Sequence, residues 1–146
     1  MKKLMALVLT LICALMFAAC DLSLLMGLFG TGNSIAEVAK TENMVVITVN
    51  EAEDGVTLLS VMESLQADGL MTFTKDSQGM VTSVNGKENA ADWSACWMLY
   101  TSDTEFASTE WGGYEYKGET LGSAVFGADA LPVKQGEVYI WAYTSF

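Results

Sequence analysis

The sequence predicts an α+β domain in which one sheet packs on a single helix, preceded by a signal and lipidation segment. Three observations lead to this fold class. Residues 44–50 are rich in β-branched side chains and alternate as a strand does. Residues 57–68 carry apolar side chains at helical spacing, and several short strand-like runs separated by turn residues follow them. Many strands around one helix are typical of an α+β domain.

Residues 1–19 have the pattern of a secretory signal peptide. Lys2 and Lys3 precede an apolar run from Leu4 to Phe17, and two alanines stand directly before Cys20. The apolar run is shorter than the roughly 20 residues that span a bilayer. With a cysteine at the predicted cleavage point, the segment resembles the lipobox of bacterial lipoproteins. This resemblance implies that the signal is removed and that Cys20 carries the lipid anchor.

A second interpretation of the N-terminus stays open. Residues 22–29 are again apolar, so residues 4–29 could form one uncleaved signal-anchor helix, or the chain could be secreted without a lipid. A single helix would place the Asp21 carboxylate among apolar residues, which costs roughly 2.5–3.5 kcal/mol near the helix centre. In the lipoprotein interpretation, residues 20–43 are the lipidated cysteine and a linker, and residues 44–146 are the folded domain. We expect an extracytoplasmic location, anchored to the bacterial cell membrane.

The charge of the chain argues against a nucleic-acid partner. Its net charge is −11, with 7 lysines, 18 acidic residues and no histidine. Removal of Lys2 and Lys3 leaves five lysines against 18 acids, a net charge of −13. Phosphate binding needs clustered cations, which this composition does not supply. The acidity instead suits a soluble extracellular domain.

Cysteine and histidine usage predicts that the chain is not an enzyme and holds no metal ion or cofactor. Cys13 leaves with the signal and Cys20 is the lipid site, so Cys96 is alone in the mature domain, without an internal disulfide. No histidine can activate a nucleophile or join Cys96 at a metal ion. The acidic residues lack the spacing of a calcium loop. Cys96 is interpreted as a buried, inert thiol.

The elements of the domain follow from local patterns. In the helix, Leu58, Val61, Met62 and Leu65 share one face; Thr57 or Asp54 caps its start, and Gly69 ends it. Asn-Gly at 85–86 predicts a tight turn. Short strands are expected at 70–75, 80–85, 96–101 and 137–143. Residues 102–120 form a long polar stretch, and 121–131 are small and apolar, with a further short strand and a turn at Gly127.

Four segments, in their order and spacing, resemble the transcobalamin C-terminal-like domain that is found in bacterial surface lipoproteins. They are Gly55-Val-Thr-Leu-Leu, Met80-Val-Thr-Ser-Val-Asn-Gly86, Cys96-Trp-Met-Leu-Tyr100 and Gly136-Glu-Val-Tyr-Ile-Trp-Ala-Tyr143. The resemblance covers about residues 44–146. It implies a β-grasp-like fold, a mixed sheet packed on a single helix. It also implies a ligand, because in transcobalamin-type carriers this domain packs on one face of cobalamin and a separate helical domain covers the other.

The last strand supplies the first candidate binding site. It places Tyr139, Trp141 and Tyr143 on one face and the smaller residues 138, 140 and 142 on the other. We expect the aliphatic face to pack on the helix, so that the aromatic face, with Trp97, forms a platform for a flat ligand. In the alternative interpretation, residues 102–131 fold over the aromatic face and make a second small core.

The second candidate is the segment 111–116, Trp-Gly-Gly-Tyr-Glu-Tyr, in which Trp111 stands beside paired glycines as in a binding loop. A self-packed loop is the alternative. Trp93 can join either aromatic cluster. The predicted function is therefore a membrane-anchored lipoprotein with a small-ligand-binding module, for cobalamin or a similar corrinoid, that serves uptake through a membrane transporter. The alternative is a surface protein-interaction or adhesion module with no small-molecule ligand.

Overall fold

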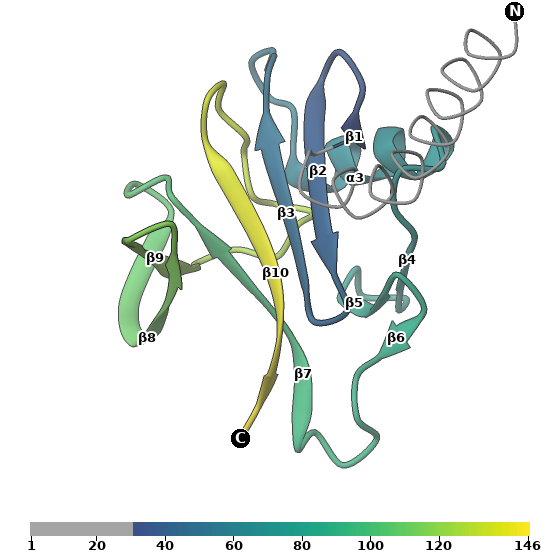
Figure 1. Ribbon diagram of the computed structural model, residues 1–146, viewed down its shortest axis with the longest axis vertical. Coiled ribbons are helices and arrows are strands. Elements are labelled where there is room, and N and C mark those ends of the chain that lie inside the picture. Colours follow the sequence, from purple (N-terminus) through teal and green to yellow (C-terminus); the bar gives the residue numbers. More distant parts are fainter. Residues whose placement is uncertain (1–30) are drawn as a thin grey trace, which may run out of the picture. The chain divides into compact units, whose positions relative to one another are not determined.

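Residues 31–146, which the computed structural model describes, fold into two β-sheets and one helix (Figure 1). The α+β class with a single helix is confirmed. The expected signal peptide, the lipid site Cys20 and the first part of the expected linker lie outside the described residues. The larger sheet has the strand order β1-β2-β3-β10-β7-β9-β8, and the smaller sheet has the order β4-β5-β6.

The elements have the following bounds along the chain: β1 (Thr31–Gly32), β2 (Ala36–Thr41), β3 (Met44–Val49), α3 (Leu58–Ala67), β4 (Phe73–Lys75), β5 (Val81–Val84), β6 (Lys87–Glu88), β7 (Ala95–Thr101), β8 (Ala107–Tyr116), β9 (Glu119–Ala124) and β10 (Val138–Ser145). The predicted Asn85-Gly86 turn joins β5 to β6, and both residues have positive φ.

The strand pairings correct the expectation of a mixed sheet. Within residues 31–146 every pairing between strands is antiparallel. The C-terminal strand β10 lies between β3 and β7 and runs opposite to both, with Trp141 between Val45 and Leu99. β3 and β7 therefore run in the same direction. β10 lies between them and runs in the opposite direction, so both of its pairings are antiparallel.

The expected linker is wrong over the residues that the structure describes. Residues 36–41 form β2, which pairs with β3 from Ala36 opposite Val49 to Thr41 opposite Met44. Ala36 and Val38 point into the core and are buried, whereas Glu37 between them is exposed. The run is short and contains two alanines, so its alternation is a weak strand signal in the sequence.

The helix α3 confirms the sequence prediction. The Thr57 hydroxyl oxygen accepts the backbone N–H of Ser60 at 3.4 Å and caps the first turn. Gly69, at φ +72°, follows the last turn. The four predicted apolar residues, from Leu58 to Leu65, are all buried against the sheet. α3 lies behind the strands β2 and β3 in the view of Figure 1.

The two faces of β10 are exchanged relative to the expectation. Tyr139 and Trp141 face the helix, with 0% and 5% of their surface exposed, and Trp97 on β7 is 5% exposed in the same core. Ile140 and Ala142 face the opposite side, in a second buried cluster. A helix of ten residues covers a broad sheet incompletely, so large aromatic side chains fill the remaining volume better than aliphatic ones.

Much of residues 102–120, expected as a long polar stretch, forms a hairpin at the edge of the larger sheet, together with the start of residues 121–131, where a further short strand was expected. Strand β9 pairs with β7, and β8 pairs with β9 on its outer side. The turn residues Lys117 and Gly118 both have positive φ, as a two-residue hairpin of this kind requires. Tyr114 packs on Tyr100 with 5.2 Å between ring centroids. The sequence did not predict β8, because an edge strand can carry polar side chains on most of its surface.

An ion-pair cluster fastens the start of this hairpin to the turn before β10. The Lys134 ammonium lies 2.9 Å from Oδ2 of the buried Asp103 and 2.7 Å from Oε2 of Glu105. Hydrogen bonding to Asp103, and then to Glu105, raises the pKa of Lys134 above its usual value. The cluster therefore stabilises the fold only while Lys134 is protonated.

The position of β2 in the sheet predicts the effect of shortening the chain. A chain that begins at Met44 leaves β3 without one of its two partners and removes two buried side chains. We expect a loss of several kcal/mol in the free energy of unfolding, a large share of a domain's stability. Thermal unfolding followed by circular dichroism measures this against a chain that begins at Thr31. Equal, cooperative transitions for the two chains would contradict the assignment of β2 to the domain.

The ion-pair cluster predicts a pH-dependent stability. Lys134→Met should lower the urea midpoint at pH 7, because Asp103 then stays buried without its cation. Since the folded-state pKa of Lys134 is raised, its contribution is complete below the ordinary lysine pKa of about 10.4 and fades as the pH rises above it. The difference between the two proteins should therefore shrink at alkaline pH. Lys117→Met is the control, because Lys117 forms no ion pair within residues 31–146. An unchanged difference at high pH would contradict the assignment.

Candidate functional site

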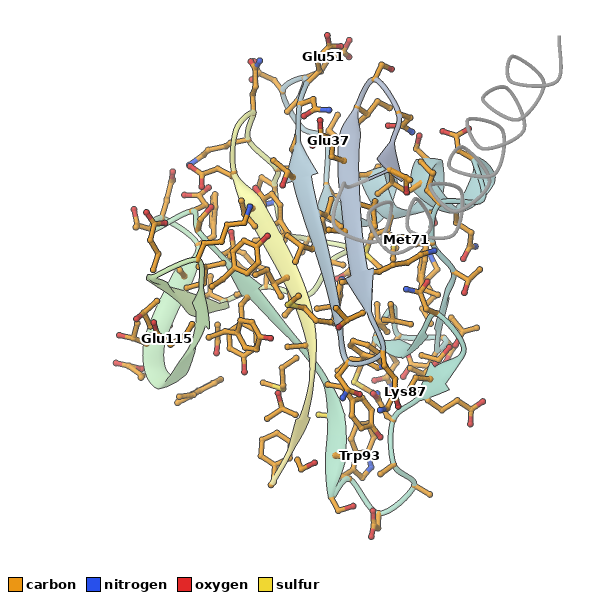
Figure 2. The ribbon with its side chains drawn as sticks, in the orientation of Figure 1. Glu37, Glu51, Met71, Lys87, Trp93 and Glu115 are labelled. Carbon is orange, nitrogen blue, oxygen red and sulfur yellow. The ribbon has the colours of Figure 1, made fainter. Side chains whose placement is uncertain are left out.

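Three tryptophans converge on a cavity of about 380 Å³. Trp93 comes from the loop before β7, Trp97 from β7 and Trp141 from β10. We call this the tryptophan cavity. Met80 and Asp129 lie at its rim, and a neighbouring hollow of similar size shares Met80 and Trp93 with it. Trp93 therefore lines two adjoining hollows. Figure 2 shows its side chain at the loop that enters β7.

Trp93 has an unusual backbone conformation for a bulky residue. Its φ is +59°, in the left-handed region, and 54% of its surface is exposed. The loop holds this conformation through the Asp92 carboxylate, which accepts the Ser94 hydroxyl at 2.7 Å and the Ser94 N–H at 3.1 Å. These hydrogen bonds lower the pKa of Asp92. Residues held in strained backbone conformations cluster at functional sites.

The indole N–H groups of the other two tryptophans differ in their partners. Trp97 donates its Nε1–H to the carbonyl oxygen of Lys87 at 2.7 Å. Nε1 of Trp141 is buried and has no acceptor among residues 31–146. A buried donor without an acceptor costs about 1–3 kcal/mol and is uncommon in native proteins. The unpaired Nε1 of Trp141 has essentially no accessible surface, so it lies within the core and not on the open wall of the cavity.

Asp129 brings a carboxylate to the rim of the cavity between two glycines. A Cβ atom on Gly79 would lie 3.3 Å from Oδ2 of Asp129, and one on Gly127 would lie 2.9 Å from Oδ1. The φ of +86° is what favours glycine at position 79, whereas the exposed Asp129 side chain could move away from a Cβ at either position. In the described part of the chain, no lysine forms an ion pair with Asp129. Its negative charge is available at the mouth of the cavity.

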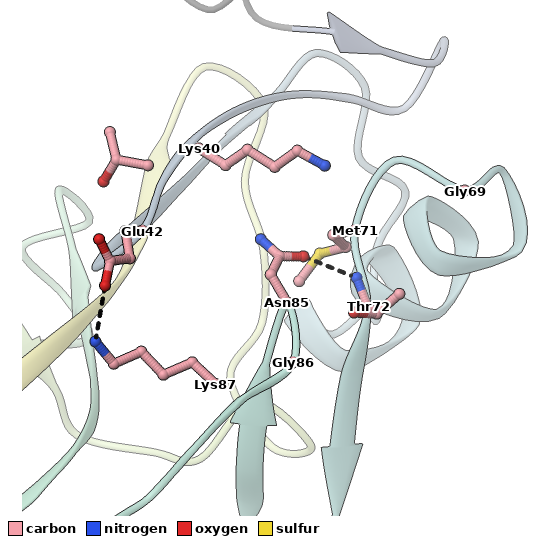
Figure 3. A pocket seen from close by; sticks show the side chains of 9 residues that line it. Lys40, Glu42, Gly69, Met71, Thr72, Asn85, Gly86 and Lys87 are labelled. Carbon is pink, nitrogen blue, oxygen red and sulfur yellow. Dashed lines mark hydrogen bonds and ion pairs between the residues drawn. The ribbon is translucent and has the colours of Figure 1, made fainter.

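A larger hollow of about 690 Å³ lies between Lys40 and Lys87 (Figure 3). Protein groups already engage both ammonium groups. Lys40 donates to the carbonyl oxygen of Leu70 at 3.1 Å, and Lys87 donates to the Asn43 side chain and lies 3.9 Å from Glu42. Lys40 forms no ion pair within residues 31–146, so its charge remains available in this hollow. The hollow has no aromatic wall, however, and the tryptophan cavity is therefore the stronger candidate site for a flat ligand.

The structure brings together two of the five predicted ligand-binding residues, Trp97 and Trp141. Tyr143 lies against Trp97 with 5.4 Å between ring centroids, and its hydroxyl donates to the carbonyl oxygen of Glu88. Tyr139 is fully buried, its hydroxyl accepts the Lys134 N–H, and burial raises its pKa. Trp111 lies apart on β8. The aromatic face of β10 therefore does not form an exposed platform.

Other residues of the site carried less signal in the sequence. Asp129 and Met80 meet only through the tertiary fold, so no local pattern could pair them. Trp93 was visible as an aromatic residue, but its backbone conformation was not. Cys96, expected to be buried, is only partly so; its Sγ lies 3.8 Å from Sδ of Met98, and burial raises the pKa of its thiol.

Comparison of the chain with protein-family models, curated proteins and solved structures found no match. Over residues 31–146, no helix is long and apolar enough to cross a membrane. Within the same range, no three His, Cys, Asp or Glu side chains are grouped so that they could hold a metal ion. Support for a function comes from the cavity itself.

The backbone of Trp93 predicts an unusual order of variant stabilities. Trp93→Gly and Trp93→Ala both remove the indole and differ only in Cβ. In regular secondary structure a glycine variant is normally less stable than the alanine variant, by about 0.5–1 kcal/mol. At φ +59° the order should reverse, because a Cβ in the left-handed region costs about 1 kcal/mol. Urea unfolding of both variants measures the difference.

The control for this comparison is Ala91→Gly in the same loop, where φ is not positive. There glycine should lower the stability. A Trp93→Ala protein that is more stable than Trp93→Gly would contradict the strain at this position.

Proposed function

We propose that the chain is an extracytoplasmic lipoprotein, anchored to the membrane through Cys20, whose domain binds a small flat ligand between tryptophan side chains. One observation carries the proposal: three indoles converge on one cavity, and one of them is held half exposed by a strained backbone. Aromatic walls with a few placed polar groups are typical of small-molecule sites. Binding and delivery to a membrane transporter, without catalysis, is the activity that we propose.

We also propose a relationship to the transcobalamin C-terminal-like β-grasp domains. The single helix packed on a sheet supports it, whereas the antiparallel neighbours of β10 do not support the mixed sheet of that fold. A cavity of about 380 Å³ is near the lower end of the roughly 300–1,000 Å³ that ligand sites enclose. It suits a small planar ring, or one edge of a corrinoid whose remaining surface stays outside.

Titration calorimetry with cyanocobalamin tests the proposal on the full-length protein. We expect binding that weakens about tenfold in Trp93→Ala, because the indole supplies stacking area at the mouth of the cavity. Trp111→Ala is the matched control, since it removes an exposed indole that does not line the cavity. Absence of heat at about 100 μM ligand would overturn cobalamin as the ligand. Equal affinity of the wild type and Trp93→Ala would overturn the cavity as the site.

A second candidate function, a surface protein-interaction or adhesion module, is favoured by the exposure of Trp111. This residue is 85% exposed on β8, the edge strand of the larger sheet (Figure 1). Ser108 pairs with Ser123 and Gly113 with Gly122, so residues 109–112 project from the hairpin without partners on β9. Large exposed aromatic side chains mark interaction sites. If this function is correct, Trp111→Ala abolishes attachment to a partner and leaves calorimetry with small ligands unchanged.

A further inference from the structure

Among the three tryptophans that line the tryptophan cavity, Trp93 alone offers a large accessible surface. It is 54% exposed, whereas Trp97 and Trp141 are each 5% exposed. Trp93 also lines the neighbouring hollow, so a molecule in either hollow can contact this indole. The chemistry around Trp93 therefore determines what the site can hold.

The charged groups of both hollows are carboxylates. Asp129 lines the tryptophan cavity, and Asp76 and Glu88 line the neighbouring hollow. Within residues 31–146, no lysine lines either hollow and none of these three carboxylates forms an ion pair. The two hollows that share Trp93 are therefore negatively charged, and no lysine of the described residues balances that charge.

Two lysines that could have neutralised this charge are directed elsewhere. Lys75 and Lys87 each directly precede one of the acids of the neighbouring hollow in the sequence. Lys75 nevertheless forms an ion pair with Glu63 at 3.1 Å, and Lys87 lies 3.9 Å from Glu42. Successive side chains of an extended chain point to opposite sides, which separates each lysine from the acid that follows it. The negative charge beside Trp93 attracts a cation that approaches from solvent.

The accessible indole specifies the kind of cation. Tryptophan is the best aromatic partner for a cation, and Met80 adds a polarisable thioether at the rim. A planar, delocalised cation such as guanidinium stacks on an aromatic face and is more weakly hydrated than an ammonium group. Its parallel N–H groups also match the two oxygens of one carboxylate. An anion would be repelled from the same surface.

From these features we infer that the ligand of the tryptophan cavity is a planar organic cation that carries an amidinium or guanidinium group. The cation stacks on the indole of Trp93 and directs its N–H groups to the carboxylate of Asp129. Asp76 and Glu88 add attraction from the neighbouring hollow. This inference rests on the proposed function and specifies the charge of its flat ligand.

Three probe molecules separate charge from shape. Benzamidine is a planar cation, benzamide is its uncharged counterpart of nearly the same shape, and benzylammonium carries the same charge on a strongly hydrated group. For the full-length protein we expect calorimetry to show benzamidine binding about tenfold more tightly than benzamide, with benzylammonium between them. The preference should narrow when the salt is raised from about 0.05 M to about 0.5 M, because exposed charges are screened.

Two tryptophan variants locate the binding. Trp93→Ala should weaken benzamidine about tenfold, because the stacking surface is removed. Trp93→Gly, which the left-handed backbone favours, repeats the measurement if Trp93→Ala does not fold. Trp111→Ala is the matched control, since it removes an 85% exposed indole that lines neither hollow. An equal loss in Trp111→Ala would mean unspecific stacking on exposed indoles and would overturn the inference.

A charge variant tests the carboxylate. Asp129→Asn should weaken benzamidine about threefold to tenfold and leave benzamide nearly unchanged. Glu51→Gln is the control, because it removes an equal charge at an exposed turn that lines neither hollow (Figure 2). A similar effect of both variants would show that only the net charge matters, and it would overturn the role of Asp129.

The failures of the two proposals are distinguishable. If benzamide binds as tightly as benzamidine, the inferred charge of the ligand is wrong, although the cavity still binds flat molecules. If benzylammonium binds as tightly as benzamidine, the recognition of a planar cation is wrong. If none of the three probes binds at about 1 mM, the inference is overturned, and the proposed binding function fails with it only if cyanocobalamin also gives no heat.

Discussion

The insertion of β10 between β3 and β7 is the interaction on which the rest of the structure depends. β3 and β7 are separated in the chain by the helix and the small sheet, and only the C-terminal strand joins them. The side chains of Tyr139 and Trp141 then meet the apolar face of α3 in one continuous core. Without β10 the two halves of the sheet would have no pairing with each other, and the core shared with the helix would lose Tyr139 and Trp141.

The same strand also makes the binding site and the core interdependent. Trp141 belongs to the core and to the wall of the tryptophan cavity, and its neighbour Trp97 has the same double role. A site built from strand residues with fixed rotamers holds its shape before the ligand arrives, which lowers the entropy lost on binding. Substitutions at these two positions would change stability and affinity together, whereas Trp93 and Asp129 lie at the rim and can be changed separately.

How much the sequence could predict depended on whether a pattern is local. The helix was predicted, with Thr57 as one of two candidate caps, because the spacing of Leu58 to Leu65 is contained in one segment. The alternation in β10 correctly grouped Tyr139 with Trp141, but alternation does not say which face is buried. Which face of β10 packs on the helix depended on how much of the sheet α3 covers. β2 and β8 were missed because two alanines in β2 and an exposed edge position in β8 weaken the usual strand composition.

Trp93 links the fold to the proposed function most directly. A loop between two strands can close with glycine or asparagine at a left-handed position, as Asn85 and Gly86 do between β5 and β6. At position 93 a tryptophan has the left-handed conformation instead, at φ +59°, and about half of its surface is exposed. The hydrogen bonds between Asp92 and Ser94 do not involve the Trp93 side chain, so they would form around a smaller residue as well. The strained backbone and the place of the indole at the mouth of the tryptophan cavity are the observations that support our proposal that Trp93 contacts a ligand.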